Sequence, residues 1–205
     1  KPTLHGVKPE SLAHYPCMFS RKGIAYSIHQ ILDLLRAHQF DLVLWGDLEG
    51  YIDPPTTRAI AQAAGSVPIA LVDQQDDAVD HWNRMTSYIG RLDIHFKREM
   101  IASWDYGSQT VPLPFAYADQ RVPEWRDAAR TEDLFWAGHR QFGLRRLYLE
   151  HVEQRFGLAL SRVFTQKEYA AALSNARVGL NIFGFGFDTV RYWEVPAQGA
   201  MLLAD

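Results

Sequence analysis

Cysteine is nearly absent from the sequence, since Cys17 is the only one among 205 residues. A single cysteine excludes an intrachain disulfide, an iron–sulfur cluster and a cysteine-based zinc site. The sequence also lacks any run of about 18 apolar residues, the length that a membrane-spanning helix requires. We therefore predict no transmembrane segment. A reducing cytoplasm fits this composition, and a position at the surface of a membrane fits it too.

The sequence has no large excess of either charge: it contains 21 Lys and Arg and 24 Asp and Glu, which gives a formal net charge of −3. This balance argues against a nucleic-acid-binding protein, whose affinity comes largely from neutralising phosphates. Hydrophobic residues make up 47% of the chain and charged residues 22%. Such a chain buries a core, which excludes wholesale disorder, and its length fits one large domain or two small ones.

Apolar runs and helical periodicity alternate through the first half of the chain. This alternation is typical of a parallel sheet with helices on its faces. The predicted helices cover residues 24–38, 57–64 and 79–89, and the predicted strands cover 40–45, 68–72 and 93–96.

Periodicity is lost over residues 107–127, where Gly107, Pro112, Pro114 and Pro123 lie, so we predict an interdomain connection there. Alternation then resumes, which predicts an amino-terminal domain over 1–118 and an incomplete carboxyl-terminal domain over 119–205. Because the sequence ends on a run that reads as a buried strand, we expect the native polypeptide to continue beyond Asp205. The second half has predicted helices at 143–155, 166–174 (capped by Thr165) and from about 189, with strands at 133–137, 158–164, 178–182 and 200–204.

A glycine-rich loop at 183–188 is a candidate ligand site. Gly184 and Gly186 allow the backbone to approach a ligand closely, and Asp188 or Thr189 can cap the helix that follows. Arg191 in the first turn suits a phosphate, and Glu194 could accept hydrogen bonds from a ribose diol. The alternative is an ordinary strand–turn–helix in which Arg191 and Glu194 form a surface ion pair.

Acidic and basic residues follow the predicted strands of the first half. Asp76 and Asp77 come after the 68–72 strand, where a carboxylate could act as general base, and His81 lies one helical turn later and could serve instead. The alternative is a solvated turn in which Asp76 or Asp77 caps a helix. Lys97 and Arg98 follow the next strand and could steady a phosphate or an acidic acceptor, or be plain surface charges.

Three residues that follow the 133–137 strand are further candidates for nucleotide contact. Gly138 permits a tight turn beside a ligand, and His139 or Arg140 could touch the nucleotide. The remaining histidines lack the spacing of a metal-binding helix, so we expect no metal site. The Gly184 and Gly186 pattern fails the dinucleotide fingerprint at its third glycine, which disfavours an NAD-dependent oxidoreductase.

The stretch from Lys167 to Asp205 resembles the donor-binding domain of GT-B glycosyltransferases, and it is most similar to the group-1-like branch that includes the spore-maturation-type proteins. The resemblance lies in an apolar strand with Leu-Asn, a glycine loop, Arg-x-x-Glu and a glycine before a final apolar strand. Other segments agree with this branch in order, from about residue 40 onward. The matching residues are Leu180-Asn181, Gly184 and Gly186, Arg191 and Glu194, Gly199-Ala200, Asp73 to Asp77, Phe96 to Glu99, Pro112 to Phe115, and Phe135 with Gly138.

The resemblance implies two Rossmann-like units in a GT-B arrangement, with a nucleotide-sugar cleft between them. It implies that Arg191 holds the donor diphosphate and Glu194 the ribose, without a metal or other cofactor. The expected reaction moves a sugar from a nucleotide-diphosphate donor to a hydroxyl of a glycan, protein or small-molecule acceptor. Gly186 stands where retaining relatives often carry a further glutamate. The alternative is therefore a non-catalytic protein that binds nucleotide sugars or a partner.

Overall fold

The computed structural model describes residues 26–46, 53–117, 122–124 and 129–205. The chain divides into two compact units between Pro114 and Phe115. We call them the amino-terminal and carboxyl-terminal units. Each contains its own parallel sheet, with strand orders β1-β2-β3-β4 and β5-β6-β7. The mixed α/β class with parallel sheets, predicted from the sequence, is therefore confirmed. The predicted boundary at 118/119 and Cys17 lie outside the described residues.

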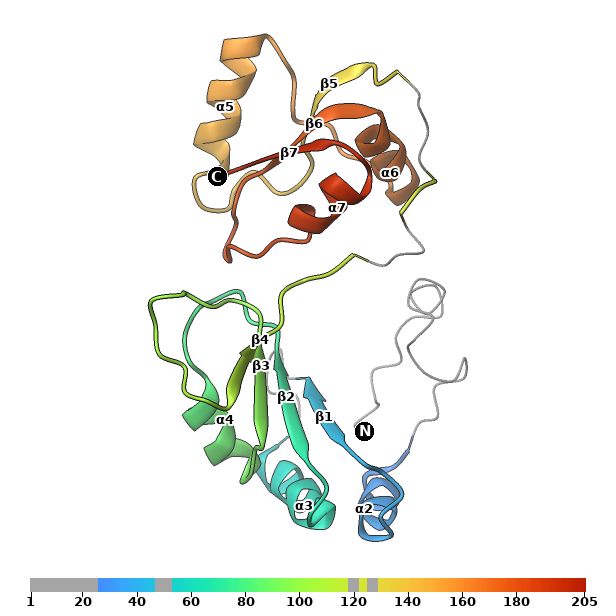
Figure 1. The fold of residues 1–205 in the computed structure, drawn as a ribbon, viewed down its shortest axis with the longest axis vertical. Helices are drawn as coiled ribbons and strands as arrows, with labels where there is room; N and C mark the ends of the chain where they lie inside the picture. Colours follow the sequence, from blue (N-terminus) through green and yellow to red (C-terminus); the bar gives the residue numbers. More distant parts are fainter. Residues whose placement is uncertain (1–25, 47–52, 118–121, 125–128) are drawn as a thin grey trace. The chain divides into compact units, whose positions relative to one another are not determined.

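The amino-terminal unit alternates helices and strands as its hydrophobic pattern predicts (Figure 1). Its strands all run parallel, so their carboxyl ends share one edge of the sheet. Ile69 and Leu71 of the central strand β2 pack against Met85 and Ile89 of the helix α4 in the main core. The elements are α2 (Ile28–Arg36), β1 (Val43–Gly46), α3 (Pro54–Ala64), β2 (Ile69–Asp73), α4 (Trp82–Ile89), β3 (Ile94–Lys97) and β4 (Thr110–Pro112).

The strand β4 lies in the segment that the sequence analysis assigned to an interdomain connection, so that assignment is wrong for residues 110–112. β4 pairs in parallel with β3, with Thr110 opposite His95 and Pro112 opposite Lys97. Pro112 cannot donate a backbone hydrogen bond, and proline in sheets is confined to such edge positions. The neighbouring Leu113 amide donates to the Lys97 carbonyl instead, at 2.8 Å.

The carboxyl-terminal unit is a three-stranded parallel sheet between helices (Figure 1). Leu149 of α5 packs with Trp136 in one core cluster, whereas Leu173 of α6 and Val195 of α7 pack with Phe135 in another. α5 therefore covers one face of the sheet, and α6 and α7 cover the other. The elements are β5 (Glu132–Phe135), α5 (Arg145–Phe156), α6 (Gln166–Asn175), β6 (Ala176–Asn181), α7 (Arg191–Ala197) and β7 (Met201–Ala204).

Three predictions for this unit differ from the structure. Residues 158–164 form no strand, because the apolar Leu160 fills the core beside α5 without joining a sheet ladder. The last helix begins at Arg191 rather than near Thr189, whose hydroxyl donates to the Asn181 side chain instead of capping α7. β7 was expected to be buried, but Met201 on this edge strand of the described sheet is 66% exposed.

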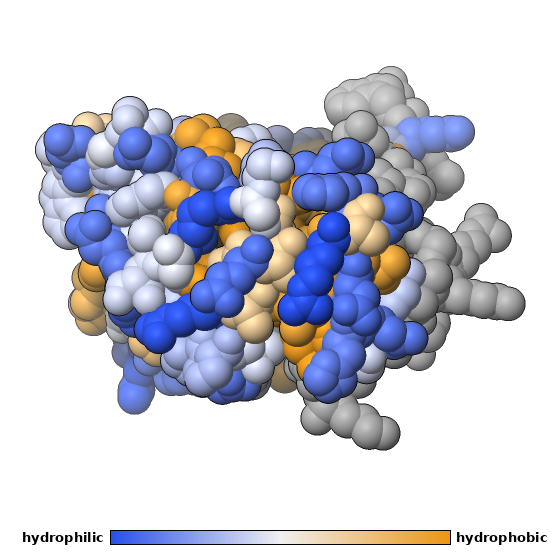
Figure 2. All heavy atoms as spheres, turned by 90° about the horizontal axis from the view of Figure 1, so that it is seen from below, coloured by the Kyte–Doolittle hydropathy of each residue, from blue (hydrophilic) through white to orange (hydrophobic). Residues whose placement is uncertain are grey.

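The described surface mixes polar and apolar residues. Figure 2 shows one face on which hydrophilic and hydrophobic residues are interspersed. None of the helices within the described ranges has the length and apolar character needed to cross a membrane.

Candidate functional site

Two arginines lie at the carboxyl edge of the β5-β6-β7 sheet. Arg145 is the first residue of α5, after the loop that leaves β5, and Arg191 is the first residue of α7, after the loop that leaves β6. Arg145 is only 7% exposed. Its Nε donates to the Ile182 carbonyl at 2.9 Å, which fixes the guanidinium beside the end of β6. A Cβ at Gly184 would lie 2.8 Å from Arg145 Nη2, so a side chain at position 184 would displace this guanidinium.

Arg191 reaches toward the end of β5. Its Cζ lies 6.0 Å from the centre of the Trp136 ring, within the range of a cation–π contact. A Cβ at Gly138 would stand 2.6 Å from Arg191 Nη2. The Nε atom of Arg191 is buried and has no hydrogen-bond partner within the described part of the chain. The Arg191 guanidinium is thus positioned at this sheet edge, and its Nε remains available to donate a hydrogen bond.

The charge of Arg191 acts on the guanidinium of Arg145. Burial lowers the pKa of Arg145, the positive charge of Arg191 lowers it further, and the carboxylate of Asp205 acts in the opposite direction. In the described residues, neither arginine forms an ion pair with a carboxylate. Two neighbouring cations without paired carboxylates favour binding of an anion, and arginine suits the geometry of phosphate.

Two further buried donors lie at the same sheet edge. Trp136 directly follows β5 and Asn181 ends β6, and Trp136 Nε1 and Asn181 Nδ2 both lack hydrogen-bond partners among the described residues. A buried polar group without a partner costs about 1–3 kcal/mol. Oxygen atoms of a ligand at this edge would satisfy such donors, so the edge has the character of a site for an oxygen-rich anion.

Glu194 lies one turn beyond Arg191 on α7, but its partner is Tyr169 of α6. The Tyr169 hydroxyl donates to Glu194 Oε2 at 2.6 Å. Burial raises the pKa of Tyr169, and the hydrogen bond to Glu194 raises it further. No ion pair joins Arg191 and Glu194 in the described structure, so the expected surface pair is wrong, whereas the strand–turn–helix of the same alternative is observed. The Glu194 carboxylate is instead oriented by the half-buried Tyr169.

The loops after β5 and β6 lie side by side. Glycine is favoured at 143, because its φ is +54° and an added Cβ would stand 3.3 Å from the Gly184 carbonyl oxygen. The His139 ring meets Phe142 edge-on, and Phe142 lies 4.7 Å from the ring of Phe185. Predicted residues His139, Gly138, Gly184 and Gly186 therefore all belong to these two adjoining loops.

Asp188 and Thr189 anchor the 183–188 loop. The Asp188 carboxylate accepts a hydrogen bond from the Phe115 amide at 2.6 Å and one from Trp193 Nε1 at 3.4 Å. The predicted capping role is wrong for both residues, because Val190 occupies the N-cap position and α7 has no side-chain cap. Because α7 has only seven residues, an anion at this edge would be held by the guanidinium groups rather than by a helix dipole.

Arg140, predicted to touch phosphate, is engaged elsewhere. Its Nη1 and Nη2 donate to the two carboxylate oxygens of Glu153 at 2.9 and 2.7 Å. The bonds from Arg140 lower the pKa of Glu153 to about 2, and the Leu160 amide contributes to this shift. We therefore leave Arg140 out of the site.

Asp73, His95 and Lys97 form a buried network at the carboxyl edge of the amino-terminal sheet. Asp73 Oδ2 accepts hydrogen bonds from His95 Nε2 and Lys97 Nζ, both at 3.1 Å. Burial raises the pKa of Asp73, but the hydrogen bonds from His95 and the Gln75 amide, together with Lys97, outweigh it and bring the pKa to about 2. Lys97 is completely buried, so the expectation that it reaches a phosphate is corrected.

Asp77 and His81 form a second pair beside this network. His81 Nε2 lies 3.0 Å from Asp77 Oδ1, and the Asp77 side chain is 45% exposed whereas that of His81 is 10% exposed. Lys97 Nζ donates to the Asp77 backbone carbonyl at 2.9 Å. Asp76 contacts the guanidinium of Arg98 instead. Of the three predicted catalytic residues, Asp77 and His81 are therefore brought together and Asp76 is paired with a cation.

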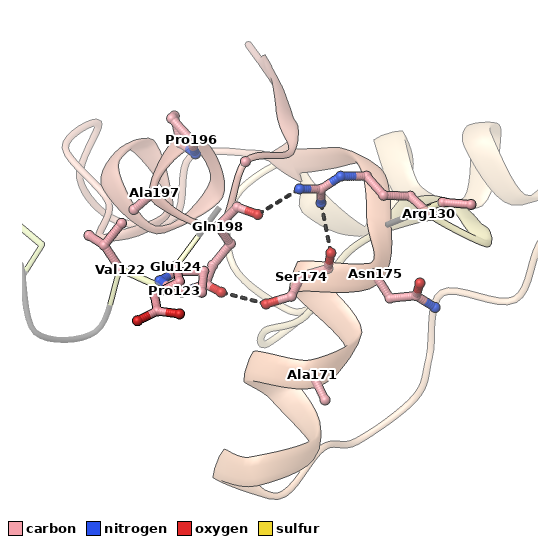
Figure 3. A pocket seen from close by; sticks show the side chains of 12 residues that line it. Val122, Pro123, Glu124, Arg130, Ala171, Ser174, Asn175, Pro196, Ala197 and Gln198 are labelled. Carbon is pink, nitrogen blue, oxygen red and sulfur yellow. Dashed lines mark hydrogen bonds between the residues drawn. The ribbon is translucent and has the colours of Figure 1, made fainter. Parts of the chain in front are cut away.

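A pocket of about 460 Å³ opens at the opposite edge of the carboxyl-terminal sheet (Figure 3). Arg130 precedes β5, and Gln198 precedes β7, so the pocket lies at the amino ends of the strands. The Arg130 guanidinium donates to the carbonyls of Ser174, Ala176 and Gln198. The Arg130 guanidinium is therefore already bonded to backbone carbonyls. Ligands of open parallel sheets also bind at the carboxyl edge, so this pocket is not our candidate site.

Sequence reasoning missed Arg145, Tyr169 and the Trp136 indole as members of the site. The sequence did hold a sign of Arg145, because this arginine is the first residue of a helix that follows a loop with glycines. Its closeness to Arg191 could not be predicted from local sequence, because the two residues are far apart in the chain. No group of three or more His, Cys, Asp or Glu suited to a metal ion is found in the described ranges. A scan against models of protein families and a search of curated proteins found no match to this chain.

Proposed function

We propose that this chain is a glycosyltransferase whose carboxyl-terminal unit binds a nucleotide-sugar donor. The observation that carries the proposal is the convergence of Arg145 and Arg191 at the carboxyl edge of a parallel sheet, where Arg145 Nη1 donates to the His139 carbonyl and the Arg191 guanidinium lies beside Gly138. The resemblance of residues 167–205 to GT-B donor-binding domains supports the same assignment.

The donor diphosphate lies against Arg145 and Arg191 in this proposal. Each guanidinium can form charge-assisted hydrogen bonds to phosphate oxygens, which are about twice as strong as neutral ones. Gly138 and Gly184 leave the room that the two guanidinium groups fill. Glu194 accepts from the ribose diol through Oε1, while Tyr169 holds Oε2.

Transfer begins when an acceptor hydroxyl oxygen attacks the anomeric carbon of the donor sugar. The bond between that carbon and the diphosphate oxygen breaks, and its electron pair leaves with the diphosphate. Arg145 and Arg191 stabilise the negative charge that develops there. The hydroxyl proton passes to a general base, so a glycoside, a nucleoside diphosphate and a protonated base result.

Asp77 is our candidate for the general base. Its carboxylate is the exposed member of the pair with His81, whose Nε2 lies 3.0 Å from Asp77 Oδ1. The Val79 amide donates to the same oxygen at 2.9 Å and helps fix the carboxylate. A carboxylate held in this way can accept a proton from a hydroxyl that reaches it.

A thermal-shift screen of UDP-, GDP-, ADP- and CDP-sugars, with NAD as control, tests the donor assignment. A ligand present at 100 times its dissociation constant stabilises the folded protein by about 2.7 kcal/mol. We expect one nucleotide class to do so and NAD not to. Incubation of that donor with candidate acceptors then separates the two functions: release of nucleoside diphosphate supports a transferase, and tight binding without release supports the non-catalytic alternative.

A further inference from the structure

The loop between β3 and β4 presents an exposed tryptophan. Trp104 is 52% exposed, whereas Tyr106, two residues later, is 7% exposed. The two rings are stacked, with centroids 6.3 Å apart and planes inclined by 30°. The buried tyrosine therefore supports one side of the indole and leaves other indole surface in solvent.

Tyr106 ties this loop to the segment that carries the candidate base. Its hydroxyl donates to the Ala78 carbonyl at 2.7 Å and accepts from the Ile101 amide at 3.1 Å. Ala78 directly follows Asp77. The loop after β3 and the Asp77–His81 pair are thus joined at one edge of the amino-terminal sheet.

The loop is also internally braced. The Trp104 amide donates to the Ile101 carbonyl at 2.9 Å, and Asp105 Oδ1 accepts from the Gly107 amide at 2.8 Å. These bonds fix the backbone on both sides of the indole. Binding a ligand therefore costs little conformational entropy in the loop backbone.

The residues on either side of Trp104 in the loop, from Ala102 to Asp105, are small or polar. Ser103, Asp105 and Gln109 are exposed, as is the small Ala102. A protein-docking surface would present several apolar side chains together, because such interfaces have a hydrophobic core. One flat aromatic ring with hydroxyl, carboxylate and amide groups nearby instead matches a sugar, which has an apolar C–H face and a rim of hydroxyls.

We propose that Trp104 is the platform on which a sugar ring of the acceptor stacks. This deepens the proposed transferase function, on which it rests, by naming a carbohydrate as the acceptor class. The C–H face of a pyranose lies on the indole, and the hydroxyls at its rim exchange hydrogen bonds with the polar side chains of the loop. Trp104 is then a binding residue for the acceptor, on the same sheet edge as Asp77.

Saturation-transfer NMR on the whole chain, without nucleotide, tests the platform. The probes are methyl β-glucopyranoside, methyl β-galactopyranoside, methyl α-mannopyranoside and cellobiose. We expect saturation to pass to the ring C–H protons of at least one probe. Replacing the stacked ring by a small side chain in Trp104→Ala should weaken binding by about tenfold, since an aromatic contact contributes up to about that factor. Trp104→Phe should keep most of the affinity.

The control is Phe156→Ala, which removes an exposed aromatic residue of the carboxyl-terminal unit that is 65% exposed. It should bind the probes as the wild type does. No transfer to any probe, or transfer that persists unchanged in Trp104→Ala, would overturn the platform. Titration of the same protein with UDP, GDP, ADP and CDP reports separately on the donor site. Sugar binding without nucleotide binding would therefore leave the platform standing and contradict the donor assignment.

Discussion

The guanidinium of Arg191 fills the space in which a side chain at position 138 would stand. A Cβ added to Gly138 would lie 2.6 Å from Arg191 Nη2 and 3.5 Å from the Trp136 ring. The backbone of Gly138 also has a φ of +147°, which side-chain-bearing residues rarely adopt. The observed position of the Arg191 guanidinium therefore requires glycine at position 138.

Gly138→Ala should displace Arg191 and weaken nucleotide binding. The strained backbone alone costs of order 1–3 kcal/mol of folding stability. Urea unfolding measures this loss, and calorimetric titration with the nucleotide identified by the thermal-shift screen measures the binding.

Gly157→Ala is the matched control for this substitution. Gly157 has a φ of +66° at the end of α5, and a Cβ there would meet nothing within 4 Å. It should lower stability by about 1 kcal/mol because of its left-handed backbone and leave binding unchanged. Wild-type nucleotide affinity in Gly138→Ala would contradict the coupling between Gly138 and Arg191.

The buried Asp73 carboxyl should make the amino-terminal unit sensitive to acid. Its pKa is about 2 in the folded chain, below the ordinary value of 3.8. The ionised Asp73 carboxylate stabilises the folded state above about pH 4, and this contribution is lost as the pH falls toward 2. The reason is that Asp73 in the unfolded chain binds a proton at a higher pH than Asp73 in the folded chain. The loss should be roughly 2 kcal/mol, and it should shrink in Asp73→Asn. Urea midpoints between pH 2 and 5 measure it. Equal acid dependence in both proteins would contradict the role of Asp73.

Lys97→Met should destabilise the amino-terminal unit strongly. The substitution leaves Asp73 buried without its ammonium partner, and removing one member of a buried pair costs about 3–5 kcal/mol. Lys167→Met, at an exposed position of α6, should change stability by less than about 0.5 kcal/mol. Thermal unfolding compares the two variants. A wild-type melting temperature for Lys97→Met would contradict the buried pairing.

Tyr169→Phe should weaken the binding of nucleotides but not of inorganic pyrophosphate. The hydroxyl orients Glu194, our candidate for the ribose contact, whereas pyrophosphate has no ribose. Removing a hydrogen bond to a charged group typically costs about 1.5–3 kcal/mol, and we expect part of this in nucleotide affinity. Tyr148→Phe, at an exposed position of α5, serves as the control. Equal weakening of pyrophosphate binding would show that Tyr169 supports the phosphate site or the fold instead.

Local signals predicted most of the elements. Thr165 and Glu168 form the capping box at the start of α6, where the cap was expected, whereas α3 begins at Pro54, earlier than the expected residue 57, because Asp53 caps it. Such caps depend on residues three or four apart, so sequence spacing reports them directly. The strand β4 escaped prediction because it is three residues long, contains Pro112 and exists only through its pairing with β3.

The site was predictable in part. Arg191 and Glu194 were chosen from sequence, but their partners Trp136 and Tyr169 belong to other parts of the unit, after β5 and on α6. The burial of Lys97 could not be predicted from sequence spacing. It follows from the register of β2 and β3, which places Lys97 opposite Asp73.

Calorimetric titration of the nucleoside diphosphate that emerges from the screen tests the central claim most directly. Arg191→Ala removes a cation from the proposed phosphate site. It should weaken binding by roughly 10- to 150-fold, because a hydrogen bond to a charged group is worth about 1.5–3 kcal/mol.

The matched control is Arg146→Ala, next to Arg145 on α5, where an exposed arginine pairs with Glu150 at 2.7 Å. This variant should bind as the wild type does, since an exposed ion pair contributes little and Arg146 lies outside the proposed phosphate site. The account predicts a large loss in Arg191→Ala and none in Arg146→Ala. Equal affinities in both variants, or a wild type that binds no nucleotide, would contradict it.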